Sequence, residues 1–170
     1  MLRDGELYRR IEAGDMSALD ELIGGYYPEI LRYCRRHAPD GRGEDAAQET
    51  FLNAVRHLEA YTHRGHFRAW LYRIAANVCA DFWRDALPGD EPDELPHTEP
   101  GYERAELSAD LESALSRLSD EQRAVIELRY MQGLKLRECA EVLNMPLRTV
   151  QSRERAALKT LKKFFERGQA

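Results

Sequence analysis

The sequence predicts an all-α protein with two small helical domains joined by an acidic, proline-rich linker. Apolar residues recur at spacings of three and four along most of the chain, as in amphipathic helices. No segment of useful length alternates apolar and polar residues, so strands are not expected. Prolines at positions 88, 92, 96 and 100 forbid a helix there. The predicted domains are residues 1–86 and 107–170, and residues 87–106 form the linker.

Four helices are expected in the first domain, at residues 2–13, 16–38, 44–60 and 67–86. Asp15 or Ser17 can cap the second helix, and the Pro-Asp-Gly sequence at residues 39–41 ends it. The third helix is expected to bury a stripe made of Ala47, Phe51, Val55 and Leu58. The fourth is expected to bury Leu71, Ile74, Ala75, Val78 and Phe82.

Four more helices are expected after the linker, at residues 103–117, 120–131, 136–143 and 147–165. Ser119 can cap the helix that follows it, and Gly133 ends that helix. The last two helices are separated by three residues only, which is the spacing of a helix-turn-helix.

Several local choices agree with this helix-turn-helix. Ala140 is small where the two helices cross closely, and Asn144 stands where the chain must turn with a positive φ. Pro146 favours a new helix start, and Val150 is placed to pack at the crossing. The outward side chains form a polar stripe that can donate to phosphates and base edges: Arg148, Gln151, Ser152 and Arg155. The alternative is an ordinary helical hairpin packed into a core.

The charge of the chain is unevenly distributed. The net charge is −5, but residues 121–170 carry 11 Lys and Arg against 6 Asp and Glu. Residues 88–120 carry only 2 basic against 10 acidic residues, and residues 1–87 carry 12 against 14. A basic segment that coincides with a helix-turn-helix indicates contact with nucleic acid.

Residues 61–77 intersperse aromatic and basic side chains more densely than the rest of the chain. Aromatic faces stack on unpaired bases, while arginines hold the backbone of the strand. The side chains left over from the predicted core are His63, Arg64, His66, Phe67, Arg68, Arg73 and Asn77. For Trp70, Tyr72 and Trp83 a place in the core is the alternative. His63 and His66 lack Cys or carboxylate ligands at matching spacing, so no metal is expected.

The helix from Glu44 offers a second surface. Its members lie three or four residues apart and are neither wholly polar nor needed by the core: Asp45, Gln48, Glu49, Leu52 and Arg56. A mixed face of this kind suits docking on a partner protein. An ordinary solvated helix face fits the same spacing.

Several classes of protein are not expected. Cys34, Cys79 and Cys139 lie far apart without a CxxC pair, which indicates buried thiols in a reducing cytosol. Residues 1–6 lack the apolar core of a signal peptide, and no apolar run is long enough to span a bilayer. No nucleophile–base pair, paired carboxylates or glycine-rich phosphate loop is evident. The expectation is a soluble, cytoplasmic, non-enzymatic protein without a cofactor.

Together these motifs resemble the sigma-70 family of bacterial RNA polymerase initiation factors, specifically its short extracytoplasmic-function (ECF) members. In the first domain the resemblance is carried by EDAAQETF at residues 44–51 and FRAWLYRIAAN at residues 67–77, followed by Asp81 and Arg84. In the second domain it is carried by LSRL at 115–118, QR at 122–123, LR at 128–129, GL at 133–134, ECAEVL at 138–143 and TVQSR at 149–153. It extends over nearly the whole chain, from about Leu7 to Phe165.

The resemblance implies a transcription initiation factor with three binding surfaces. The first domain would bind core RNA polymerase through the face of Asp45, Gln48, Glu49, Leu52 and Arg56. It would capture a flipped base of the −10 element through His63, Arg64, His66, Phe67, Trp70, Arg73 and Asn77. The second domain would bind the −35 element through Arg148, Thr149, Gln151, Ser152, Arg153 and Arg155. Many relatives are held inactive by an anti-sigma partner.

The same resemblance implies that the acidic linker enters the nucleic-acid channel of polymerase, where negative charge suits basic walls. A passive spacer is the alternative for this segment.

The sequence departs from the family pattern at four places. Arg148 replaces a small residue, Leu118-Ser119 replaces Leu-Pro, and Asn144 replaces the usual Gly of the turn. Residues 156–158 read Ala-Ala-Leu in place of Arg-Ala-Arg, which removes two phosphate-directed cations. Arg148 and Arg155 are hypothesised to compensate for them.

Two other functions fit parts of the sequence. A helix-turn-helix regulator with an N-terminal sensing or dimerisation domain would not need the base-stacking segment of the first domain. An enzyme on a helical bundle would need a metal at His63 and His66.

Overall fold

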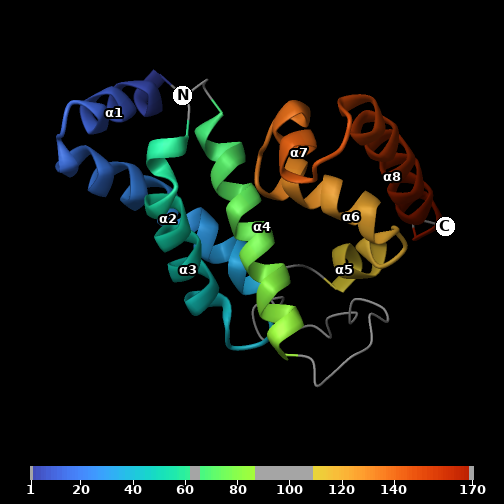
Figure 1. The fold of residues 1–170 in the computed structure, drawn as a ribbon. Coiled ribbons are helices and arrows are strands. Elements are labelled where there is room, and N and C mark those ends of the chain that lie inside the picture. The colour runs from blue at the N-terminus through green and yellow to red at the C-terminus, as the bar shows by residue number, and fades with distance from the viewer. Residues whose placement is uncertain (1, 62–65, 87–108, 169–170) are drawn as a thin grey trace. The chain divides into compact units, whose positions relative to one another are not determined.

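The computed structural model describes residues 2–61, 66–86 and 109–168 (Figure 1). None of these residues lies in a strand, and the all-α prediction is confirmed. The chain divides into two compact units, unit 1 at Met1–Gly101 and unit 2 at Tyr102–Ala170. The predicted linker, residues 87–106, lies outside the described residues, so its bounds and those of the two domains stay a prediction.

Unit 1 consists of α1 (Leu2–Glu12), α2 (Met16–His37), α3 (Gly43–Arg56), the short 3-10 helix η1 (Leu58–Ala60) and α4 (Phe67–Ala86). The bounds of α1, α2 and α4 agree with the predicted helices to within one residue. The predicted third helix is divided at His57, where the chain leaves α3 and turns into η1.

Unit 2 consists of α5 (Ala109–Leu115), α6 (Asp120–Ile126), the π-helix η3 (Glu127–Met131), α7 (Leu136–Val142) and α8 (Leu147–Gly168). Residues 103–108 of the predicted fifth helix lie outside the described residues. The predicted helix at 120–131 is helical throughout but widens into η3. There the N–H of Gln132 donates to the oxygen of Glu127, five residues back, at 3.0 Å.

The predicted caps at Asp15 and Ser119 are confirmed by their contacts, whereas α5 ends two residues before the predicted 117 and α8 extends three residues beyond the predicted 165. Asp15 accepts from the N–H of Ser17 at 3.1 Å at the start of α2. Ser119 and Gln122 form a reciprocal capping box at the start of α6. Asn144 takes a φ of +51°, as expected for the turn between α7 and α8. Local chemistry therefore determines where these helices begin and end.

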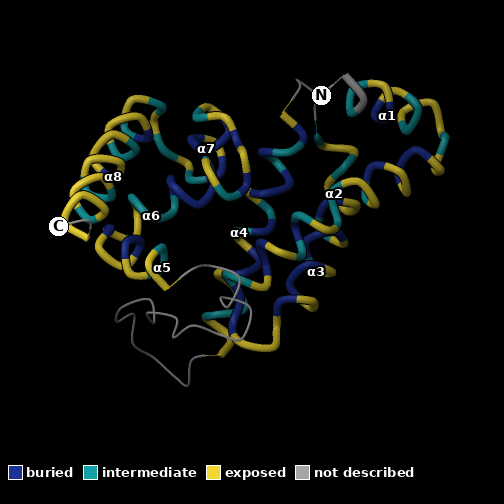
Figure 2. The backbone as a smooth tube through the Cα atoms, turned by 180° about the vertical axis from the view of Figure 1, so that it is seen from behind, coloured by how far each residue is buried: buried dark blue, intermediate teal, exposed yellow. Residues whose placement is uncertain are grey.

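The core of unit 1 forms where α4 packs against α2 and α3 (Figure 2). Tyr72 of α4 is fully buried, and its hydroxyl donates to the Glu29 carboxylate of α2 at 3.0 Å. Arg68 donates to the same carboxylate oxygen at 2.8 Å. Burial and then the charge of Glu29 raise the pKa of Tyr72, so its hydroxyl stays a donor.

One predicted core residue is wrong, and three others of the predicted stripes are only half-buried: Leu58, Ile74 and Phe82. Val55 is 43% exposed, whereas the buried face of α3 consists of Ala46, Ala47, Thr50, Phe51 and Ala54. Thr50 can occupy this face because its hydroxyl donates to the backbone oxygen of Ala46 at 2.7 Å. The buried stripe therefore passes through Thr50 and Ala54, and Val55 turns outward.

The core of unit 2 forms between α8 and the helices before it. A cluster of buried apolar side chains joins α5, α6 and α8: Leu115, Leu118, Ile126 and Ala157. Val150 of α8 is fully buried, as the helix-turn-helix prediction requires. One face of α8 is thereby held inward, which leaves the opposite face for solvent (Figure 2).

None of the described helices is both long enough and apolar enough to cross a membrane.

Gly43 makes the close approach between α2 and α3 possible. It is buried at the first position of α3, and a Cβ at this position would lie 2.6 Å from the Cα of Arg35. A backbone atom cannot move aside as a flexible side-chain end can, so α2 and α3 would have to separate.

We expect Gly43→Ala to lower the free energy of unfolding of unit 1 by about 1–3 kcal/mol, as overpacking does. Gly25→Ala in α2 is the matched control, because nothing lies within 4 Å of its added methyl group. The control should stabilise the helix by about 0.5–1 kcal/mol. Urea unfolding followed by tryptophan fluorescence measures both variants, because Trp70 and Trp83 both lie in unit 1. Equal stabilities would contradict the close approach.

Candidate nucleic-acid interface

The outer face of α8 presents the polar stripe that the sequence predicts. Arg148, Gln151, Ser152 and Arg155 are all exposed, whereas Val150 and Ala157 are buried on the opposite side of the helix. Neither Arg148 nor Arg155 forms an ion pair with another described residue. Both guanidinium groups are therefore available to an external anion.

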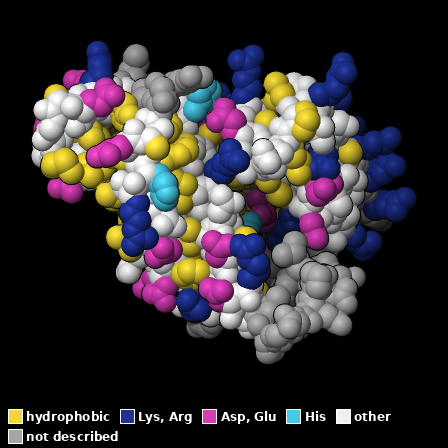
Figure 3. All heavy atoms as spheres, viewed as in Figure 1, with side chains coloured by type: hydrophobic (Ala, Val, Ile, Leu, Met, Phe, Trp, Pro, Cys, Tyr) yellow, Lys and Arg dark blue, Asp and Glu magenta, His cyan; other side chains and the backbone are white. Residues whose placement is uncertain are grey.

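The basic face of α8 extends further than the sequence analysis predicted. Lys159 and Lys162 lie three or four residues apart beyond Arg155, on the same side of the helix, and both are exposed. Lys162 lies 3.8 Å from the Glu166 carboxylate, an exposed pair that leaves it hydrated. Figure 3 shows Lys and Arg side chains projecting from the edge of the molecule where α8 lies. The sequence analysis could have identified these lysines by continuing the spacing of three and four residues along the helix beyond Arg155.

Arg153 differs from the other arginines of α8. Its guanidinium lies 2.6 Å from the Glu121 carboxylate of α6, and its side chain is only 25% exposed. Thr149 is half-buried as well. In this conformation Arg153 holds α8 against α6.

The three residues after the stripe differ in exposure. Ala157 is fully buried in the core cluster of unit 2, whereas Ala156 and Leu158 are exposed. The two positions at which the family pattern places arginine are thus the two that face solvent. The absence of arginine at these two positions changes the charge of the surface and leaves the packing of α8 unaffected.

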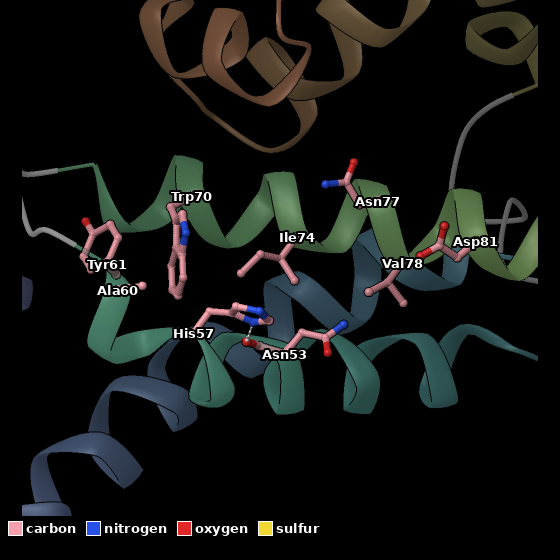
Figure 4. Close-up of a pocket in the computed structure, with 9 residues that line it drawn as sticks. All are labelled: Asn53, His57, Ala60, Tyr61, Trp70, Ile74, Asn77, Val78 and Asp81. Carbon is pink, nitrogen blue, oxygen red and sulfur yellow. Dashed lines mark hydrogen bonds between the residues drawn. The ribbon is translucent and has the colours of Figure 1, made fainter.

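Unit 1 contains a pocket of about 440 Å³ between the end of α3 and the side of α4 (Figure 4). Its volume lies in the range of small-ligand sites. The pocket is lined by Asn53, His57, Ala60, Tyr61, Trp70, Ile74, Asn77, Val78 and Asp81. Trp70 and Tyr61 form one end, and Asp81 lies at the other end (Figure 4).

The aromatic end of the pocket is a packed cluster. The ring centroids of Tyr61 and Trp70 lie 4.6 Å apart, and Phe67 packs against both rings at 5.6 and 5.5 Å. Phe67 is only 6% exposed, so it supports the cluster from behind. Tyr61 and Trp70 are half-buried and line the cavity.

α1 holds Tyr61 in place. The hydroxyl of Tyr8 donates to the backbone oxygen of Tyr61 at 2.6 Å, and the two rings meet edge to face at 5.6 Å. Burial and then the nearby charge of Glu12 raise the pKa of Tyr8, which keeps the hydroxyl protonated as a donor. The first helix of the chain thus contributes to the pocket through Tyr61.

The structure brings together only part of the predicted −10 set. Trp70 and Asn77 line the pocket, with Asn77 leaving the side of α4 that is turned away from α3 (Figure 4). His66 and Arg73 are exposed outside the lining. His63 and Arg64 lie outside the described residues. Arg68 binds Glu29.

Asn53 and His57 were missed by the sequence analysis. They belong to the end of α3, and only the packing of α4 over that end brings them to the same cavity as Trp70. For Tyr72 and Trp83 the structure favours the alternative to base stacking, a place in the packing of unit 1. Tyr72 is fully buried, and the indole N–H of Trp83 donates to the backbone oxygen of His37 at 2.7 Å.

The predicted partner-binding face of α3 is a mixed surface. Asp45, Gln48, Leu52 and Arg56 are exposed, and Glu49 is half-buried and lies 3.5 Å from Arg56. Leu52 is 51% exposed, and the outward-turned Val55 adds a second apolar side chain beside it. An apolar pair among charged groups is typical of a protein-docking surface.

No group of three or more His, Cys, Asp or Glu side chains that could hold a metal occurs among the residues described by the structure.

Two protein families match the chain in sequence. "Sigma-70 region 2" matches residues 22–87, and "Sigma-70, region 4" matches residues 108–161. The chain is 30% identical to the ECF RNA polymerase sigma factor SigW of Bacillus subtilis, over 91% of this chain and 92% of SigW. It is 30% identical to the ECF RNA polymerase sigma-E factor of Escherichia coli, over 89% of this chain and 88% of that protein.

Solved structures give the same result for the fold. CnrH, in complex with the cytosolic domain of CnrY, superimposes with a TM-score of 0.73 at 26% identity, over 96% of this chain and 97% of CnrH. The sigma factor RpoE of Bartonella quintana, in complex with the anti-sigma factor NepR, has a TM-score of 0.64 at 19% identity, over 87% of this chain and 96% of RpoE.

We expect Arg153→Ala to lower the stability of unit 2 by about 0.5–1 kcal/mol, because its ion pair with Glu121 is partly shielded from water. Arg148→Ala is the matched control and should stay within about 0.5 kcal/mol of the unchanged chain. Hydrogen exchange of α6 and α8 measures both. If the two variants exchange equally fast, Arg153 does not hold α8 against α6.

Proposed function

This chain belongs to the ECF sigma factors of the sigma-70 family, and from that premise we propose how it directs RNA polymerase to promoters. The proposal assigns one surface to duplex DNA, one to an unpaired base and one to the polymerase core. The observation that carries it is the coexistence of an exposed cationic helix face in unit 2 with an aromatic-ended pocket in unit 1.

Unit 2 is proposed to bind the −35 duplex through the outer face of α8. The helix-turn-helix presents α8 to the major groove, where exposed Arg, Gln and Ser side chains can donate to base edges and phosphates. The residues proposed for this contact are Arg148, Thr149, Gln151, Ser152, Arg153 and Arg155, and Lys159 and Lys162 extend the set. Arg153 takes part only if it leaves Glu121, so we propose a supporting role for it first.

Unit 1 is proposed to capture an extruded base of the −10 element in its pocket. An extruded base must recover the stacking that it loses, and Tyr61 and Trp70 offer aromatic surface at one end of the cavity. Asn77, whose side chain leaves the side of α4 turned away from α3, is proposed to contact the strand through its amide. His66 and Arg73, which are exposed near the pocket, are proposed to contact the strand, as are His63 and Arg64. Phe67 is proposed to support the aromatic end.

The exposed face of α3 is proposed to dock on core polymerase, and an anti-sigma factor would compete for the same face. Support comes from the apolar pair Leu52 and Val55, bordered by Asp45, Gln48, Glu49 and Arg56. The acidic linker is proposed to follow the nucleic-acid path of the polymerase. In this account the chain performs no chemistry of its own and acts in the cytoplasm, where core polymerase carries out RNA synthesis.

A simple helix-turn-helix regulator is not favoured. Such a protein would not need the pocket. Nor would its N-terminal domain be expected to match region 2 of the sigma-70 family, as residues 22–87 of this chain do.

We expect Arg148→Ala and Arg155→Ala each to weaken binding of holoenzyme to a −35 duplex and to reduce the salt slope by about one. The reason is the loss of one phosphate-directed or base-directed cation. The duplex is taken from a promoter transcribed by the reconstituted holoenzyme, and affinity is measured over a series of salt concentrations.

Arg117→Ala, an exposed arginine outside α8, is the control of equal charge and should leave the slope unchanged. Unchanged affinity and slope for Arg148→Ala would falsify the hypothesis that this arginine compensates for Ala156 and Leu158.

We expect Leu52→Ala to weaken binding to core polymerase about fivefold, because about half of this side chain is available to be buried on docking. Met16→Ala removes an apolar side chain of similar exposure, 59% against 51%, from α2 and serves as the control. Titration of labelled protein with core polymerase gives both affinities. Equal affinities would remove α3 from the docking surface.

A further inference from the structure

The second helix of the helix-turn-helix, α8, carries a carboxylate that is held by the π-helix η3. The side chain of Glu154 is only 14% exposed. Its Oε1 accepts from the hydroxyl of Tyr130 at 3.0 Å. The Nε of Arg129, the residue before Tyr130, lies 3.7 Å from the same oxygen. One side chain of α8 is thus contacted by two consecutive residues of η3.

The π-helix helps both residues to reach this carboxylate. Consecutive side chains of an α-helix point about 100° apart. A π-helix has more residues in each turn, so it brings consecutive side chains closer together. The widening of α6 into η3 therefore has a consequence at α8, because Arg129 and Tyr130 both lie within it.

Arg129 connects this contact to the start of α7. Its Nη1 donates to the backbone oxygen of Leu134 at 3.0 Å, two residues before α7 begins. Its Nε is buried and makes no hydrogen bond within the part of the chain that the structure describes. The charge of the nearby Glu154 carboxylate stabilises the buried guanidinium by Coulomb attraction. Arg129 thereby links η3, the segment that leads into α7, and the middle of α8.

Arg153 and Glu154 hold α8 from opposite sides. Val150 and Ala157, seven residues apart, mark the line along which α8 faces the core. By the helical period, Arg153 leaves one side of that line for Glu121 of α6, and Glu154 leaves the other side for η3. Small apolar side chains resist a slight rotation of the helix only weakly, whereas polar contacts are directional. The rotation of α8 about its axis therefore depends on these two contacts.

The rotation of α8 matters for the reading of bases. Outward side chains lie about 6 Å from a helix axis, so a rotation of about 20° moves them by about 2 Å. Hydrogen bonds to base edges need donor–acceptor distances of about 2.7–3.2 Å and are lost by such a shift. Contacts with phosphates carry no sequence information, and long basic side chains can adjust to keep them. A loosely held α8 would still bind duplex DNA but would distinguish sequences poorly.

We propose that Arg129 and Tyr130 are positioning residues that act through Glu154: they set the rotation of α8 and thereby determine how sharply the chain distinguishes −35 sequences. The proposal rests on the proposed function, in which α8 binds the −35 duplex. It assigns part of the sequence discrimination to residues of η3, outside the helix that enters the groove, and it separates discrimination from affinity.

The test compares two duplexes in the holoenzyme. Core polymerase carrying the full chain is titrated with a −35 duplex from a promoter that it transcribes, and with the same duplex after its −35 element is scrambled. The ratio of the two affinities measures discrimination. We expect Tyr130→Phe, which removes only a hydroxyl, to lower this ratio about fivefold, the lower end of what one good base contact contributes. Affinity for the scrambled duplex should stay within about twofold of the unchanged chain.

Glu154→Ala should lower the ratio at least as much. Adding Tyr130→Phe to it should have no further effect, because the hydroxyl acts through the carboxylate. Glu166→Ala is the matched control, since it removes an exposed carboxylate from the same helix and should change both affinities equally. Hydrogen exchange of α6 and α8 confirms that unit 2 is folded in each variant.

Three outcomes would overturn the positioning role. They are a ratio that stays within about twofold of the unchanged chain in both single variants, an equal weakening of the two duplexes, and losses that multiply in the double variant. If the unchanged holoenzyme does not distinguish the two duplexes at all, the proposed −35 function of α8 is itself wrong, and the positioning role falls with it.

Discussion

The packing of unit 1 depends on the hydrogen bonds that the carboxylate of Glu29 accepts. One of its oxygens accepts from the Tyr72 hydroxyl at 3.0 Å and from Arg68 at 2.8 Å, so a single group of α2 holds the first two turns of α4. Tyr72 is fully buried, and an unpaired hydroxyl at this depth would be costly. This anchor places the next side chains of α4 over the end of α3. The pocket is the space that remains between them, with Trp70 and His57 on its two sides.

Unit 2 follows a simpler constraint. Burial of Val150 and Ala157 determines which side of α8 is inward, and the positive φ of Asn144 allows α8 to start with only three residues between it and Leu143. Once those are set, the helical period alone turns Arg148 and Arg155 to solvent. The loss of arginine at positions 156 and 158 therefore changes a surface that the packing of the unit does not use.

Features that depend on neighbouring residues in the sequence were predictable, and features that depend on packing between distant segments were not. The Ser119 capping box and the turn at Asn144 need only a few consecutive residues. The pocket joins Asn53 and His57 to residues of α4, and Arg153 pairs with Glu121 from another helix. Val55 was misplaced because Thr50, a polar residue, satisfies its hydroxyl on its own helix and takes a core position. The −10 residues at 63–64 lie outside the described structure, so their prediction rests on the sequence.

Runoff transcription with permanganate footprinting tests the central claim most directly, because it reports duplex binding and strand opening by one protein in one reaction. Core polymerase reconstituted with the full chain is placed on chromosomal DNA fragments, and transcripts and unstacked thymines are mapped together. The account predicts promoter-specific transcripts, with reactive thymines in the −10 region of each transcribed promoter and none with core polymerase alone. Protected duplex without reactive thymines, or transcripts no more specific than those of the core enzyme, would contradict it.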